Sequence, residues 1–66
     1  MQIQVNGELR EVPEGLDVAG LLTHLQLNPG RVAIERNLEI LPRAAWKRTA
    51  VATGDRFEIV HFVGGG

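Results

Sequence analysis

The first 25 residues read MQIQVNGELREVPEGLDVAGLLTHL (residues 1–25). In this stretch Ile3 and Val5 alternate with glutamines, which is the period of a strand with one buried face. Asn6-Gly7 follows at once, and this dipeptide is a strong signal for a two-residue hairpin turn. Residues 8–12 are therefore predicted to return as a second strand, so the fold begins with a β-hairpin.

One amphipathic helix is predicted after the hairpin. The residues at spacing i, i+3, i+4 and i+7, which share one helix face, are Val18, Leu21, Leu22 and Leu25. Asp17 is placed to accept hydrogen bonds from the free backbone amides at the helix start. Residues 28–30, Asn-Pro-Gly, end the helix because a residue before proline is pushed out of the α region. Gly20 is the discordant residue, and we interpret it as a point of close approach to the sheet.

Three further strands are predicted in the rest of the chain, at residues 32–36, 39–41 and 56–60. Pro42 closes the middle one, as expected of an edge strand, because proline cannot donate a ladder hydrogen bond. Asn37-Leu38, between the first two, is a poor tight turn. Residues 44–46 are predicted to form one irregular helical turn, with Trp46 as a lid over the edge of the core.

These elements predict an α+β domain of two layers, since a single helix covers only one face of a sheet. Their order is that of the β-grasp (ubiquitin-like) fold, with a mixed sheet of four to five strands and one helix packed on one face. We expect the domain to span residues 1–63 and a flexible glycine tail to follow at 64–66. The predicted core comprises Ile3, Val5, Val12, Leu16, Val18, Leu21, Leu22, Leu25, Val32, Ile34, Ile40, Val51, Phe57 and Ile59.

Composition excludes several classes of function. The chain of 66 residues has room for one domain and has no cysteine, which removes disulfides, zinc-thiolate sites and thiol nucleophiles. Its net charge of -1 lacks the basic excess of a nucleic-acid binder. No apolar run approaches membrane-spanning length, and the N-terminus has no signal-peptide pattern. We expect a cytoplasmic protein with neither nucleic acid nor membrane as its partner.

The sequence stops on Gly64, Gly65 and Gly66, directly after the apolar run at residues 59–63. Glycine has no Cβ, so three in succession can pass through a channel too narrow for other residues. Such a tail is suited to delivering a C-terminal carboxylate into the active site of another protein. A frayed chain end is the plain alternative.

Three stretches carry a family resemblance: residues 1–8 (MQIQVNGE), residues 32–35 (VAIE) with 41–43 (LPR), and residues 54–61 (GDRFEIVH) running into the glycines. On these, the chain resembles over its whole length the ThiS family, the ubiquitin-like sulfur carriers of thiamine biosynthesis. Leu38 departs from the pattern, because the family usually has a glycine there.

The resemblance implies a non-catalytic carrier that binds no cofactor of its own. An E1-like adenylyltransferase would use ATP to adenylate the Gly66 carboxylate. A persulfide donor such as a cysteine desulfurase would then convert it to a thiocarboxylate, which hands its sulfur to thiazole synthase. Gly65 and Gly66 would be the functional pair, with Gly64 as a spacer. No catalytic residue and no metal ligand is assigned, His24 and His61 included.

Strand parity predicts a docking patch beside the tail. Phe57 and Ile59 are expected to face the helix, so Val60 faces the uncovered side of the sheet. Phe62 and Val63 then lie beyond the last paired residue with little core to fill. Exposed apolar residues beside a reactive terminus are typical of a binding surface.

Three alternatives to a thiamine sulfur carrier stay open. A carrier of the molybdopterin synthase small-subunit type uses the same chemistry, although such chains are usually longer. A ubiquitin-like modifier would join Gly66 to lysines in conjugates stable to thiol reductants. A β-grasp binding module without chemistry would tolerate any C-terminus.

Overall fold

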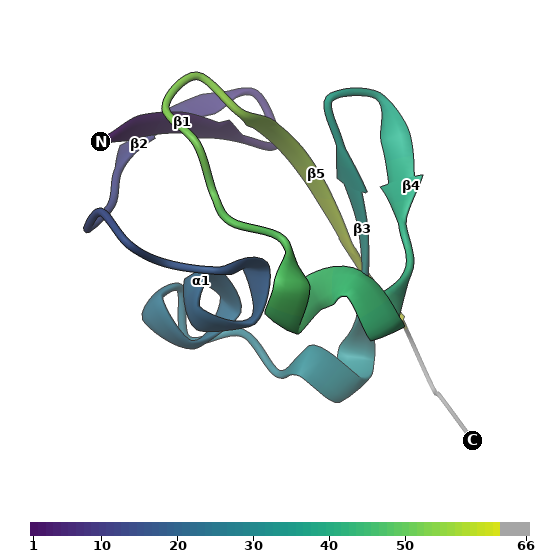
Figure 1. The fold of residues 1–66 in the computed structure, drawn as a ribbon. Helices are drawn as coiled ribbons and strands as arrows, with labels where there is room; N and C mark the ends of the chain where they lie inside the picture. The colour runs from purple at the N-terminus through teal and green to yellow at the C-terminus, as the bar shows by residue number, and fades with distance from the viewer. Residues whose placement is uncertain (63–66) are drawn as a thin grey trace.

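A computed structural model describes residues 1–62 of the chain (Figure 1). The strands are β1 (Gln2–Val5), β2 (Glu8–Glu11), β3 (Val32–Arg36), β4 (Glu39–Leu41) and β5 (Arg56–His61). The helix α1 spans Val18–His24, and the two short 3-10 helices are η1 (Pro29–Arg31) and η2 (Arg43–Arg48). All five predicted strands and the predicted helix are present, with bounds shifted by one residue at the ends of β2 and β5. The helix ends at His24, earlier than the predicted stop at residues 28–30, because Gln26 takes a left-handed φ of 60°.

The strands form one sheet in the order β2-β1-β5-β3-β4. The first and last strands, β1 and β5, are parallel neighbours at its centre, whereas the other pairs are antiparallel. Parallel neighbours need a crossover between them, and here the crossover includes α1, which lies against one face of the sheet (Figure 1). The predicted β-grasp fold is confirmed, and β4 is an edge strand as Pro42 indicated.

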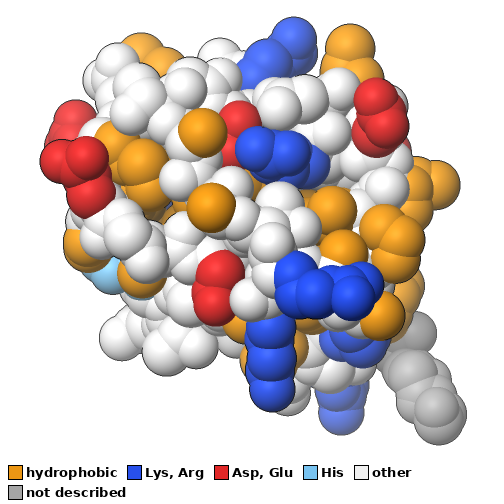
Figure 2. All heavy atoms as spheres, in the orientation of Figure 1, with side chains coloured by type: hydrophobic (Ala, Val, Ile, Leu, Met, Phe, Trp, Pro, Cys, Tyr) orange, Lys and Arg blue, Asp and Glu red, His pale blue; other side chains and the backbone are white. Residues whose placement is uncertain are grey.

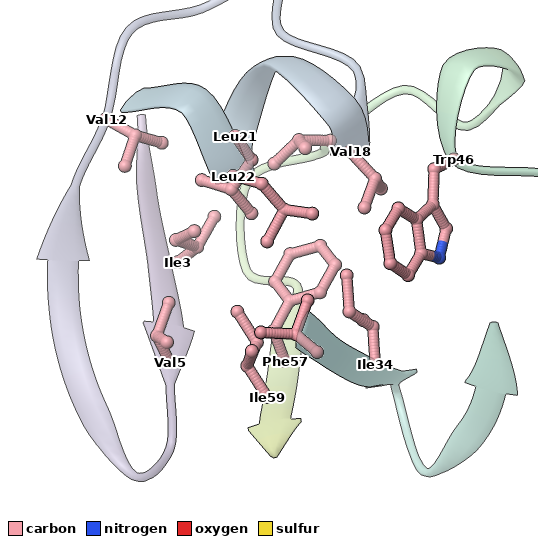
Figure 3. Close-up of a cluster of buried hydrophobic side chains, with 12 residues drawn as sticks. Ile3, Val5, Val12, Val18, Leu21, Leu22, Ile34, Trp46, Phe57 and Ile59 are labelled. Atoms are coloured by element: carbon pink, nitrogen blue, oxygen red, sulfur yellow. The ribbon is translucent and has the colours of Figure 1, made fainter. Parts of the chain in front are cut away.

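The core fills the space between α1 and the covered face of the sheet. Figure 3 shows the ring of Phe57 in the middle of it, pointing from β5 toward the helix. The buried apolar residues are Ile3, Val5, Val12, Val18, Leu21, Leu22, Val32, Ile34, Trp46, Val51, Phe57 and Ile59. Each large side chain among them contributes roughly 1.5–3 kcal/mol by leaving water, which a domain of this size needs because it has no disulfide.

The prediction that Ile40 belongs to the core is wrong. The side chain of Ile40 is 81% exposed. In the β3–β4 register Ile40 lies opposite the exposed Glu35, while Leu41 lies opposite the buried Ile34 and packs on the core. Side chains alternate between the two faces of a strand, so Ile40 points to the face that α1 leaves uncovered. Leu16 and Leu25, also predicted as core, are half-buried at its margin.

Trp46 belongs to the core rather than lying over its edge. It is 4% exposed, and its indole nitrogen donates a hydrogen bond of 3.1 Å to the backbone carbonyl of Leu41. Trp46 belongs to η2, which lies on the same side of the sheet as α1, so the two segments together cover that face (Figure 3). The irregular turn at residues 44–46 is thus the middle of a longer 3-10 segment.

Asp17 begins α1 as predicted, because its carboxylate accepts a hydrogen bond of 2.6 Å from the Gly20 amide. The interpretation of Gly20 as a contact with the sheet is wrong. A Cβ at Gly20 would lie 3.3 Å from that Asp17 carboxylate oxygen and 3.4 Å from the Leu16 side chain. The absence of a side chain at Gly20 therefore leaves space for the capping carboxylate of Asp17 and for Leu16.

Two tight turns have positive φ at both central residues, the geometry of type I′ hairpins. Asn6-Gly7 has φ of 51° and 84°, and Asn37-Leu38 has φ of 52° and 72°. The second was predicted to be a poor tight turn, since a left-handed leucine costs about 1 kcal/mol. Two residues outside the turn hold Asn37 in place: its side-chain amide donates to the Asp55 carboxylate at 3.2 Å, and its side-chain oxygen accepts from the Arg56 backbone amide at 3.0 Å.

Asp55 is the one buried charged residue among residues 1–62, with 5% of its surface exposed. It accepts hydrogen bonds from the Ala52 amide (2.8 Å), the Arg36 guanidinium (3.1 Å) and the Asn37 side chain (3.2 Å). Burial by itself raises the pKa of Asp55. The hydrogen bonds from Ala52, Asn37 and Arg36, with the positive charge of Arg36, outweigh burial and hold that pKa below 3.8.

Asp55 is expected to make stability depend on pH below about 4. A carboxyl group whose pKa is lower in the folded state binds more protons in the unfolded state. The stability that Asp55 contributes is therefore fully present above its ordinary pKa of 3.8 and is lost as the pH falls through its pKa in the folded protein. Asp55→Asn removes this dependence and lowers stability at neutral pH by about 1–3 kcal/mol. Thermal melting from pH 2 to pH 7 measures both effects, with the exposed Glu14→Gln as the control. An acid transition unchanged by Asp55→Asn would contradict this assignment.

None of the helices within residues 1–62 is long and apolar enough to cross a membrane.

Candidate functional site

The candidate site is the end of β5, from which the chain continues into its glycine residues. Two interactions hold the backbone there. His61, the last residue of the strand, pairs with Val32 of β3, and the amide of Phe62 donates a hydrogen bond of 2.8 Å to the Arg31 carbonyl of η1. The chain therefore stays attached to the domain up to the last residue that the structure describes.

Asn6 fixes the same strand from the other side. Its side-chain amide donates to the Ile59 carbonyl at 3.1 Å and accepts from the Ile59 amide at 2.7 Å, and its backbone amide donates to the Phe57 carbonyl at 2.8 Å. The register of β1 with β5 ends at Val5 and Phe57. The Asn6 side chain thus acts as one further peptide group in the parallel ladder. Sequence analysis identified Asn6 as a turn residue and missed this role.

The docking residues predicted beside the tail are exposed where the structure describes them. Val60 is 61% exposed and lies opposite Ala33 on the uncovered face of the sheet. Phe62 is 48% exposed, so about half of its surface is covered by the domain, more than the prediction of a residue with no packing implied. Val63, Gly64, Gly65 and Gly66, the rest of the predicted site, lie outside the described residues.

A separate hollow of about 610 Å³ lies between α1, η1 and η2, and its wall includes Arg43, Trp46 and Lys47. The Arg43 guanidinium lies 4.5 Å from the centre of the Trp46 ring and donates hydrogen bonds to the carbonyls of Pro29 and, at 3.1 Å, Val32. Arg43 thus links η2 to η1 and to the first residue of β3. Figure 2 shows several Lys and Arg side chains on this side of the molecule.

The two histidines form no metal site with other described residues. His24 and His61 are both exposed, and no group of three or more His, Cys, Asp or Glu side chains within residues 1–62 is arranged to hold a metal ion.

Comparison with known proteins identifies relatives along the whole chain. The family model described as the ThiS family matches residues 3–66. The "Sulfur carrier protein ThiS" of Bacillus subtilis is 35% identical over 65 residues, covering 97% of this chain and 98% of that protein. The crystal structure of the thiamine biosynthesis protein ThiS from Geobacter metallireducens is 39% identical, covers 100% of both chains and superposes with a TM-score of 0.86.

Two other relatives are much longer than this chain. A "Thiazole synthase" of Paramagnetospirillum magneticum is 44% identical over 66 residues, and a "Thiazole synthase" of Magnetococcus marinus is 38% identical. The match covers 100% of this chain but only 20% of the length of either relative. The family match covers the helix and all five strands except the first residue of β1, and the fold agrees with that of a solved ThiS protein at 39% identity. The chain belongs to the ThiS family.

Proposed function

We propose that this protein is a sulfur carrier of thiamine biosynthesis that carries the sulfur on the carboxylate of Gly66. The observation that supports this most directly is the match with the Bacillus subtilis sulfur carrier, which covers nearly the whole of both chains. The domain supports it physically, because contacts from Asn6 and Arg31 hold the end of β5 in a fixed place before the glycines begin.

The chemistry proceeds in three steps on the terminal carboxyl group. A carboxylate oxygen attacks the α-phosphorus of ATP and pyrophosphate leaves, which gives a mixed anhydride with AMP. The outer sulfur of a persulfide then attacks the carbonyl carbon and AMP leaves, and a thiol cleaves the remaining S–S bond to release the thiocarboxylate. The carrier supplies position and a reactive end, while its partners supply the catalytic groups. In this proposal the protein is not itself an enzyme.

Three partners follow from this scheme: an adenylyltransferase that uses ATP, a persulfide donor such as a cysteine desulfurase, and thiazole synthase as the acceptor of sulfur. The relatives named thiazole synthase support the last of these, because a fifth of their length matches this chain. Since the scheme consumes ATP, we place the carrier in the cytoplasm. Its domain comprises residues 1–63, and residues 64–66 form the tail that enters the partner's active site.

The proposed docking surface consists of Val60, Phe62 and Val63, next to the tail. The first two of these have 61% and 48% of their surface exposed. Apolar side chains contribute to binding when a partner covers them, at about 25 cal/mol per Å². A surface beside the tail would hold the carrier while its terminus reacts.

The experiment that tests the proposal locates the sulfur. The protein is incubated with the adenylyltransferase, ATP and a persulfide donor, and its C-terminal peptide is analysed by mass spectrometry. We expect one oxygen of that peptide to be replaced by sulfur, because the chain has no cysteine to hold it elsewhere. Omission of ATP is the control and should leave the peptide unmodified. Sulfur on any other peptide, or none at all, refutes the carrier mechanism.

A further inference from the structure

The face of the sheet opposite α1 carries a shallow hollow of about 190 Å³ on β3, β4 and β5, which we call the acidic hollow. Its lining residues are Ala33, Ile34, Glu35, Ile40, Glu58 and Val60. Ile40 and Val60 are among the most exposed large apolar residues of the domain, at 81% and 61%. Exposed apolar residues that lie together on one surface are typical of an interaction site.

Two carboxylates oppose each other within this apolar surrounding. Glu35 of β3 and Glu58 of β5 are direct partners in the antiparallel register, and both are exposed on the same face. Residues directly opposite each other in an antiparallel pair have Cβ atoms about 4.5–5.5 Å apart, and like charges at such positions destabilise the sheet. The pair therefore lowers the stability of the free domain.

Nothing within residues 1–62 neutralises the pair. Neither Glu35 nor Glu58 has an ion-pair or hydrogen-bond partner for its side chain there, in contrast to Asp55, which is paired with Arg36. Arg56, two residues before Glu58 on the same face of β5, donates its Nε hydrogen bond to Gln4 of β1 at 3.2 Å. It thus points across the sheet away from β3, and the two carboxylates remain available to another molecule.

We propose that the acidic hollow binds an arginine side chain on the surface of thiazole synthase. This inference rests on the proposed function, which names that partner. A guanidinium is planar and has five N–H donors, so it can serve two neighbouring carboxylates at once, which a lysine ammonium does less well. The methylene stem of the arginine packs along apolar surface. Ile40 provides such surface beside Glu35, and Val60 provides it two residues along β5 from Glu58.

One surface of the free domain thus combines two unfavourable features. Exposed apolar residues and opposed carboxylates are each costly in the free domain, and one arginine relieves both when it binds. Val60 joins the acidic hollow to the docking residues beside the tail, so both surfaces can face one partner. The relatives favour thiazole synthase as this partner, because a segment similar to this chain forms part of two longer proteins named thiazole synthase.

The test compares stability and affinity in the same variants. Glu35→Gln and Glu58→Gln keep the shape of each side chain and remove one charge. We expect each to melt at the same temperature as the wild type or higher, because the repulsion is relieved, and to bind separately purified thiazole synthase about tenfold more weakly. Glu14→Gln, which removes an equal charge at an exposed turn, is the matched control and should bind normally. Titration calorimetry and thermal melting provide both readouts.

Three results would overturn the proposal: unchanged affinity in both glutamine variants, an equal loss in Glu14→Gln, or a loss of affinity accompanied by a lower melting temperature. A loss of affinity for the adenylyltransferase alone would overturn the assignment to thiazole synthase. Because binding is measured with the unmodified Gly66 carboxylate, the result does not depend on sulfur transfer. A normal thiocarboxylate yield with unchanged binding would refute the acidic hollow and leave the proposed function intact.

Discussion

Adding one glycine after Gly66 is expected to abolish ATP–pyrophosphate exchange by the adenylyltransferase, and deleting Gly66 should have the same effect. One residue moves the terminal carboxylate by up to about 3.3–3.6 Å along an extended chain. Reacting atoms must lie about 3–3.5 Å apart and in line, and a displacement of 1 Å alone can lower a rate by about 100-fold. The expected loss in exchange is therefore at least about 100-fold for either change.

The added residue is a glycine so that only the position of the carboxylate changes and no side chain enters the partner's channel. Both variants should melt at the wild-type temperature, because the core consists of residues between Ile3 and Ile59. Exchange near the wild-type rate by the lengthened protein would show that the Gly66 carboxylate is not the reacting group. An equal loss with Glu14→Gln would instead indicate a nonspecific effect on the partner.

Local signals predicted the elements of the fold. The Asn6-Gly7 turn and the Asp17 helix cap depend on residues that are neighbours in the chain, and both are confirmed with the expected geometry. The helix stripe was also correct for its buried members, Val18, Leu21 and Leu22. Sequence patterns predict such features well because the interactions that stabilise them lie within a few residues.

Contacts distant in sequence were missed. Ile40 was assigned to the core because a strand of three residues has too few positions to show which parity is buried, and only pairing with β3 decides it. Asn37-Leu38 forms a tight turn because Asp55 and the Arg56 backbone fix Asn37 from 18 and 19 residues away. The opposition of Glu35 and Glu58 depends in the same way on the register of β3 with β5.

Ile59→Asp is expected to unfold the domain, whereas Phe62→Asp should leave it folded and weaken partner binding. Ile59 is 5% exposed and lies in the core, so an aspartate there places an unpaired charge among apolar side chains. Such changes cost more than about 4 kcal/mol, which approaches the whole stability of a small domain at about 5 kcal/mol. Asn6 cannot compensate, because its side-chain hydrogen bonds to this residue go to the Ile59 backbone.

Phe62 differs because it is 48% exposed and follows the last residue of β5. Replacing it removes about half the burial of a phenylalanine, roughly 1 kcal/mol, which lowers the melting temperature by less than about 8 °C. Covering its exposed half in a complex contributes a similar amount, and the charge of aspartate opposes that burial further. Affinity for the adenylyltransferase or for thiazole synthase should therefore fall by about tenfold or more.

Differential scanning calorimetry and partner titration on both variants distinguish the two roles. Leu9→Asp is the matched control, because Leu9 is 67% exposed on the edge strand β2, far in the sheet order from β3 and β4. It should neither unfold the domain nor weaken binding. A Phe62→Asp protein that melts as early as Ile59→Asp would show that Phe62 belongs to the core, and one that binds both partners normally would remove it from the docking surface. Equal weakening by Leu9→Asp would mean that an added negative charge lowers affinity wherever it is placed, so the loss in Phe62→Asp would not locate the docking surface.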